Sequence, residues 1–168
     1  MTPRRAGPHD AAKLALVGAA SFLETFANDH PGDDLTAFCA TSHSVESWSA
    51  VLADPNAAAW IVEEAAGSPV AYAVLVPGTL PGTEADDAEL KRIYVLSKWH
   101  NTGTGRALFE AAEAEARRRG AKRLALSVYT KNTRAIAFYE RAGFAVIGRA
   151  SFPGFGEEFW DYVMAKGL

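Results

Sequence analysis

The sequence is poor in cysteine, in long apolar runs and in net charge. A single cysteine, Cys39, stands among its 168 residues, which excludes an internal disulfide and favours a reducing compartment. No apolar run approaches the ~20 residues that a membrane-spanning helix needs. The apolar stretch near the start resembles a secretion signal, but Asp10 and Lys13 interrupt it. We therefore expect a cytoplasmic protein without a membrane-spanning segment.

Charge and histidine spacing exclude two further classes of function. The formal net charge is -3, so the chain lacks the basic surface of a nucleic-acid-binding protein. A basic cluster within residues 117–123 ends a predicted helix, where cations complement the helix dipole. His9, His30 and His43 show no metal-ligand spacing, and we expect no metal.

The length fits one domain over residues 1–168, and strands alternate with helices in its second half. Periodicity and capping residues predict helices over residues 10–26, 46–52, 103–119 and 132–141, and strands over residues 58–64, 70–76, 89–96, 124–128, 144–150 and 159–165. Strands 89–96 and 122–128 should be parallel neighbours, because a right-handed helical crossover joins them. The fold class is therefore α/β or α+β with a mixed sheet.

The stretch WHNTGTGR joins a predicted strand to the long predicted helix. Its two glycines lack the β-carbons that would keep a phosphate from the first N–H groups of that helix, where the dipole favours an anion. Helix starts are usually enriched in acids, yet none occurs from Lys98 to Phe109. A plain turn is the alternative, and the missing acids favour anion binding. Leu108 at the third glycine position and the absence of a GK[ST] ending exclude Rossmann and triphosphate loops.

The run ELKRIYVLSKWHNTGTGRALFEAAEAEARRRG, followed by LALSVYTKNTRAIAFYERAGF, resembles the GCN5-related N-acetyltransferase (GNAT) family over about residues 89–150. The family pattern is Gln/Arg-x-x-Gly-x-Gly/Ala after a central strand, then an Asn and a helix with Ala-x-x-x-Tyr and Gly-Phe. The stretches FLETFAN and SFPGFGEEFWDYVMAKGL look like its bacterial spermidine/spermine acetyltransferase branch. His100 departs from the pattern, because Gln or Arg is usual there. The resemblance implies a mostly antiparallel central sheet with a splayed parallel pair, flanking helices, and acetyl-CoA as cofactor.

The resemblance also implies which residues bind that cofactor. The pyrophosphate would lie on the glycine loop, which consists of His100, Asn101, Thr102, Gly103, Thr104, Gly105 and Arg106. Backbone groups of Ile93, Tyr94 and Val95 would pair with the pantetheine arm as an added strand would. Asn132, Ala135 and Tyr139 share one face of the next helix by their spacing, and they complete the predicted site.

Two residues are candidates for proton transfer. Tyr139 stays protonated at neutral pH, since a phenol has a pKa near ~10, and it can protonate a departing thiolate whose thiol pKa is ~8.5. The alternative is a core aromatic. Glu89 is the candidate base for the acceptor amine, and the alternatives are a water relay or a solvated charge at a strand end. Cys39 as an acyl-accepting nucleophile is less favoured because no patterned base accompanies it, so we expect direct transfer.

We therefore expect an acetyl-CoA-dependent N-acetyltransferase that acts on a small primary amine such as a polyamine. Alternatives are a protein N-terminal or lysine acetyltransferase and a non-catalytic acyl-CoA sensor. The sequence predicts no nucleic-acid partner and leaves a homodimer open. Acidic clusters would steer a cationic amine if they line one mouth, and otherwise are solvated loops. These clusters are Glu84, Asp86, Asp87 and Glu89, and Glu157, Glu158 and Asp161.

Overall fold

A computed structural model describes residues 1–151 and 159–168 and divides the chain into two compact units. The first unit comprises Met1–Leu75 and Arg92–Ala112, and the second comprises Val76–Lys91 and Glu113–Leu168. Three elements run from one unit into the other, namely β3 (Pro69–Pro77), β4 (Ala88–Val95) and α4 (Thr104–Arg118). The single domain over residues 1–168 stays a prediction.

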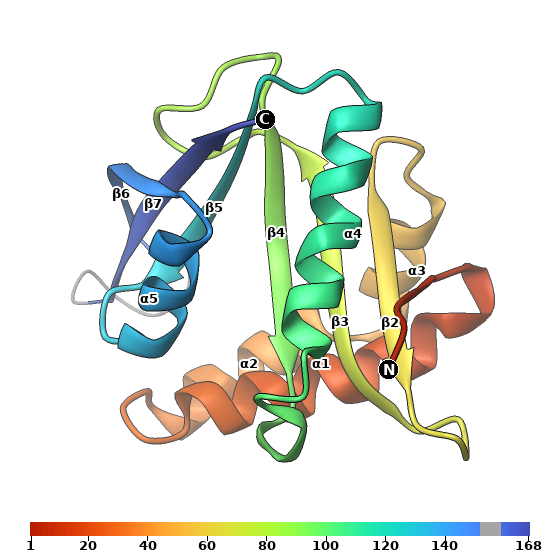
Figure 1. Ribbon diagram of the computed structural model, residues 1–168. Helices are drawn as coiled ribbons and strands as arrows, with labels where there is room; N and C mark the ends of the chain where they lie inside the picture. Colours follow the sequence, from red (N-terminus) through yellow and green to blue (C-terminus); the bar gives the residue numbers. More distant parts are fainter. Residues whose placement is uncertain (152–158) are drawn as a thin grey trace. The chain divides into compact units, whose positions relative to one another are not determined.

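The first unit holds the N-terminal helices and an antiparallel strand pair (Figure 1). Its further elements are β1 (Arg4–Arg5), the 3-10 turn η1 (Pro8–Asp10), α1 (Ala11–Phe26), α2 (Gly32–Ser42), α3 (Val45–Ala53), β2 (Ala58–Glu63) and the 3-10 turn η2 (Ser97–Trp99). β2 pairs with β3, and Ala58 lies opposite Leu75. β2 is an almost continuous apolar run because both of its faces are buried. Leu14 and Trp48 are fully buried against solvent in this unit.

Two features at the start of the chain differ from the sequence prediction. The polar sequence of residues 28–34 predicts an irregular stretch, but α2 begins at Gly32. Leu35 is its only fully buried residue, so the helix has little apolar periodicity to detect. Its start signals are Pro31 and the acids of its first turn.

Asp10 stands at the predicted start of α1, but its side chain makes no hydrogen bond to the first turn of that helix. Its carboxylate accepts instead from both terminal guanidinium nitrogens of Arg4, at 2.7 and 2.8 Å, and from the N–H of Gly7 at 2.8 Å. These bonds lower the pKa of Asp10 to about 2, with the Arg4 bond the largest cause. The residue therefore holds the N-terminal segment rather than the helix.

The second unit holds β5 (Arg123–Tyr129), α5 (Thr133–Arg141), β6 (Ala145–Ser151) and β7 (Trp160–Gly167). Figure 1 shows β5, β7 and β6 side by side, and both pairs are antiparallel. β4 pairs with β5 in parallel, with Glu89 opposite Ala125, which confirms the predicted parallel neighbours. Asn132 caps α5, and Gly143, with φ of 92°, follows its end, as the sequence predicts. Pro153, Gly154 and Gly156 predict a turn before the last strand, and these residues lie outside the described part of the chain.

The seven strands hydrogen-bond in the order β1-β2-β3-β4-β5-β7-β6. Of the strand pairs described here, β4 with β5 is parallel and β1 with β2, β2 with β3, β5 with β7 and β6 with β7 are antiparallel. This confirms the predicted mixed and mostly antiparallel sheet. Within the part of the chain that the structure describes, none of the helices combines the length and apolarity needed to cross a membrane.

Candidate active site

The glycine loop lies in the first unit, between the end of β4 and the start of α4. Gly103 has φ of 84°, a left-handed conformation that favours glycine. Gly105 does not need this freedom, and a β-carbon there would lie 3.6 Å from Cγ2 of Val95, an ordinary contact. Packing within the protein therefore does not explain Gly105. The absence of its side chain leaves backbone accessible at the first turn of α4, as a bound phosphate requires.

The first turn of α4 carries no acidic residue, and the first N–H groups of a helix have no partner within it. Hydroxyl groups hold the loop in place. The hydroxyl of Thr102 donates to the carbonyl of Trp99 at 2.7 Å and lies 2.8 Å from the hydroxyl of the buried Thr104. The residues present thus fit a phosphate group at this helix start.

His100 and Arg106 are less directly available than the sequence predicts. Nε2 of His100 donates to the carbonyl of Val95 at 2.7 Å, so this ring nitrogen ties the loop to the end of β4. Arg106 is exposed, and its Nε donates to Glu110 at 2.7 Å, one helical turn further on. Glu110 directly follows the acid-free stretch from Lys98 to Phe109. Ile93, Tyr94 and Val95 belong to the part of β4 in this same unit.

The second unit holds the predicted residues of α5. The side-chain oxygen of Asn132 accepts from the N–H of Ala135 at 3.1 Å, which confirms its capping position. Tyr139 follows Ala135 by one turn and is 7% exposed. Its ring packs edge-on against Phe138 and Phe144, with centroids 5.4 and 5.7 Å apart. The ring therefore has the fixed surroundings of a core aromatic, which is compatible with either predicted role.

Glu89 is also in the second unit and is buried, with 5% exposure. Its Oε2 accepts from both the N–H and the hydroxyl of Thr79, at 3.0 and 2.8 Å. Within the described residues, Oε1 has no hydrogen-bond partner. Thr79 therefore holds one carboxylate oxygen and leaves the other without a bond in this part of the chain. Sequence reasoning missed Thr79, because a loop brings it to Glu89 and no motif marks it.

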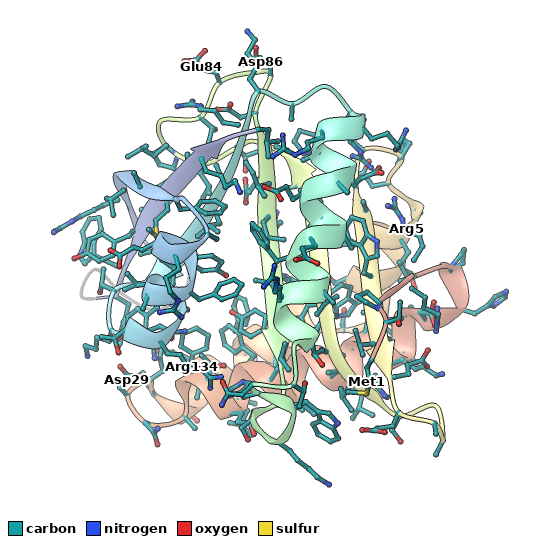
Figure 2. All side chains as sticks on the ribbon, viewed as in Figure 1. Met1, Arg5, Asp29, Glu84, Asp86 and Arg134 are labelled. Carbon is teal, nitrogen blue, oxygen red and sulfur yellow. The ribbon has the colours of Figure 1, made fainter. Side chains whose placement is uncertain are left out.

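Three of the four acids at residues 84–89, namely Glu84, Asp86 and Asp87, lie within 4.0 Å of a cation. Nη2 of Arg123 lies 2.6 Å from Oδ2 of Asp87, and Lys122 forms an ion pair with Asp86. The hydrogen bonds from Arg123 lower the pKa of Asp87 below its usual value of 3.8. Figure 2 shows Glu84 and Asp86 at the loop between β3 and β4, with their side chains directed outward. Glu157 and Glu158 of the other predicted cluster lie outside the described residues.

The sequence pattern of the acetyltransferase (GNAT) family matches residues 19–144. The chain belongs to this family. It is 32% identical over 159 residues to an uncharacterized N-acetyltransferase of Mycobacterium tuberculosis, a match that covers 95% of this chain and 98% of that relative. It is 35% identical over 100 residues to an uncharacterized N-acetyltransferase of Escherichia coli, covering 60% of this chain and 58% of that relative.

Solved structures show the same fold. The PaiA N-acetyltransferase of Thermoplasma acidophilum, crystallised with coenzyme A, aligns with a TM-score of 0.79 at 20% identity over 99% of this chain and 98% of that one. The ribosomal-protein-alanine N-acetyltransferase of Brucella melitensis aligns with a TM-score of 0.78 at 24% identity over the full length of both chains. As a GNAT member, the chain is an acyltransferase that uses acetyl-CoA.

Proposed function

We propose that this GNAT enzyme transfers the acetyl group of acetyl-CoA directly to a small primary amine. The observation that carries the proposal is the glycine loop, where the first turn of α4 has no acid and Gly105 has no packing reason to be glycine. The backbone N–H groups of residues 103–106 would bind the pyrophosphate there. Backbone groups of Ile93, Tyr94 and Val95 would hold the arm. The carbonyl of Val95 already accepts from His100, which leaves its N–H for this role.

His100 and Arg106 have supporting roles in this proposal. His100 fixes the loop against β4, and Arg106 adds positive charge near the first turn while pairing with Glu110. Asn101 has φ of 63°, and with Gly103 it gives the loop two left-handed residues that can turn N–H groups toward one anion. In the second unit, Asn132 caps α5, and the small side chain of Ala135 leaves room on the face of α5 that carries Tyr139. The family pattern assigns both residues, with Tyr139, to cofactor binding.

Glu89 is the general base of this proposal. A lysine-like amine with a pKa of ~10.4 costs roughly 4–5 kcal/mol to neutralise at pH 7. A general base that accepts its proton would therefore speed the reaction. Thr79 holds one carboxylate oxygen with two hydrogen bonds. Oε1, which has no hydrogen-bond partner among the described residues, can then accept the proton of the amine, directly or through a water molecule.

Tyr139 is the proton donor. Acetyl-CoA supplies a thioester whose thiolate leaves as the amide bond forms. The Tyr139 hydroxyl would give its proton to that sulfur, and the edge-on contacts with Phe138 and Phe144 fix the ring for this step. A sensor that only holds acyl-CoA needs neither Tyr139 nor Glu89, which favours the enzyme over the sensor.

The identity of the amine is the finer part of the proposal. A polyamine of the spermidine/spermine type is the candidate that the sequence suggests. Its support from the acidic cluster is weak, since Asp86 and Asp87 already pair with Lys122 and Arg123. A protein amino terminus is the second candidate, because the Brucella neighbour is by name a ribosomal-protein-alanine N-acetyltransferase.

The experiment that tests the proposal replaces Gly105 with Val. The added branch would occupy the backbone approach to the first turn of α4, and we expect acetyl-CoA to bind about 10- to 150-fold more weakly through loss of a charged hydrogen bond. Thermal shift with acetyl-CoA measures this, because ligand binding to the folded state raises the melting temperature. Gly7→Val is the control, since a β-carbon at Gly7 meets nothing within 4 Å. Wild-type protein that acetyl-CoA does not stabilise would contradict the proposed function.

A further inference from the structure

Arg92 of β4 is a half-buried cation in the first unit that has no carboxylate partner among the described residues of that unit. Its Nη1 donates to the carbonyl of Ser42 at 3.3 Å, and its Cζ lies 5.1 Å above the ring of Trp48. A neutral carbonyl and an aromatic face leave the positive charge uncompensated. Arg4 in the same unit differs, because it contacts both Asp10 and Glu63.

The side chains around Arg92 include buried polar atoms without partners. Among the described residues, both ring nitrogens of His43 and Nε1 of Trp48 have no hydrogen bond. These two residues are at most 4% exposed, and buried polar groups normally have a partner. Burial, and then the charge of Arg92, lower the pKa of His43 to about 4. The imidazole is therefore neutral near pH 7 and does not add to or offset the charge of Arg92.

The position of Arg92 on β4 relates it to the proposed acetyl-transfer function, on which this inference rests. Side chains alternate along a strand, so Arg92 and Tyr94 share one face while Ile93 and Val95 share the other. Tyr94 stacks on Tyr72 at 5.7 Å, on the face of Arg92, whereas Val95 lies near Gly105 of α4. An arm that pairs with Val95, Tyr94 and Ile93 would bring its acetyl end close to Arg92, since these residues span only ~10 Å.

We propose that Arg92, stacked on Trp48, binds a carboxylate of the amine acceptor, so that the acceptor is a small aminocarboxylate and not a polyamine. The guanidinium has five N–H donors in a planar fork, and the described contacts use one of them. Its remaining donors can bind a carboxylate through two parallel hydrogen bonds. A polyamine offers only positive charge, which Arg92 would repel.

Matched pairs of amines test the carboxylate site. Ornithine with putrescine, and phenylalanine with phenethylamine, differ by a carboxylate, and release of free CoA gives kcat and KM for each. We expect the wild type to prefer the carboxylate member of at least one pair by about 10- to 150-fold in kcat/KM, the value of a charged hydrogen bond. Arg92→Met should abolish that preference by raising KM for the aminocarboxylate. Its low activity with the decarboxylated amine should stay unchanged. Arg92→Lys should restore part of it, since it keeps the charge but loses the fork.

Arg149→Met is the matched control, because Arg149 is exposed and also stacks on an aromatic ring, with Cζ 5.5 Å from the centroid of Tyr162. It should keep the wild-type preference. A readout without turnover is the melting temperature with N-acetylornithine, which should rise for the wild type and not for Arg92→Met. Stabilisation of Arg92→Met by acetyl-CoA shows that the variant is folded.

The outcomes separate this inference from the proposed function. A wild-type enzyme that acetylates putrescine as well as ornithine, or that acetylates only peptides, overturns the carboxylate site and leaves the acetyltransferase assignment in place. An unchanged preference in Arg92→Met also overturns it. Absence of CoA release with every amine and peptide contradicts the proposed function itself.

Discussion

Just before β4, Asp86 and Asp87 meet Lys122 and Arg123, whereas Glu89 and Arg92 on the strand itself meet no opposite charge among the described residues of their own units. Asp87 and Glu89 are two residues apart and almost equally buried, at 4% and 5% exposure. Asp87 pairs with the guanidinium of Arg123, whereas Glu89 accepts, among the described residues, only from the neutral hydroxyl and N–H of Thr79. A buried charge that is paired with an opposite charge contributes to folding. A charge without an opposite charge nearby remains available to a substrate. Three substitutions or conditions test this difference.

The largest effect is expected for Glu89→Gln. The amide keeps an oxygen that can accept from Thr79, so the melting temperature should change little. It cannot take a proton, and general base catalysis contributes about 10²- to 10⁴-fold. We expect kcat to fall within that range, measured by CoA release with saturating acetyl-CoA.

Glu84→Gln is the control for Glu89→Gln, since this exposed acid lies in the loop before β4 and has no proposed role in catalysis. Its activity should equal that of the wild type. An unchanged kcat in Glu89→Gln would mean that Glu89 only holds the loop through its bonds with Thr79.

The opposite pattern is expected for Asp87→Ala. This change removes the partner of Arg123 and the acceptor for the N–H of Glu84, which lies 2.8 Å from Oδ2. Loss of these bonds should lower the free energy of unfolding by roughly 1–3 kcal/mol, measured by urea denaturation. Asp86→Ala is the control and should cost little, because the Asp86 and Lys122 side chains are exposed. Equal losses from the two variants would mean that burial does not distinguish these pairs.

The smallest effect concerns pH. The pKa of Asp87 in the folded protein lies below its usual value of 3.8, chiefly through hydrogen bonds from Arg123. A depressed carboxyl pKa stabilises the folded state above the unfolded pKa, and this contribution is lost as the pH falls through the folded pKa. The difference in unfolding free energy between wild type and Asp87→Asn should be constant above about pH 5 and shrink below it. Urea denaturation across this range measures it, and a difference that grows on acidification would contradict the sign.

Sequence reasoning succeeded where the cause of a structure is local. Asn132 caps α5 through a residue three positions away, and Gly143 follows the helix end with a positive φ. The long helix with its Glu113 and Arg117 pair, at 3.5 Å, follows from spacing along one turn. It failed for α2, whose helical start is marked by Pro31 and acids but whose single buried Leu35 gives no periodic stripe.

The sequence by itself determined the family, the glycine loop and the parallel pairing of β4 with β5, because each depends on residue types within a short stretch or on the order of elements. Only the tertiary structure decided which charges are paired with an opposite charge. Thr79 reaches Glu89 across ten residues, and Ser42 reaches Arg92 across fifty. A charge is matched or left open according to which side chains folding brings within ~4 Å, and residue spacing along the chain does not encode that distance.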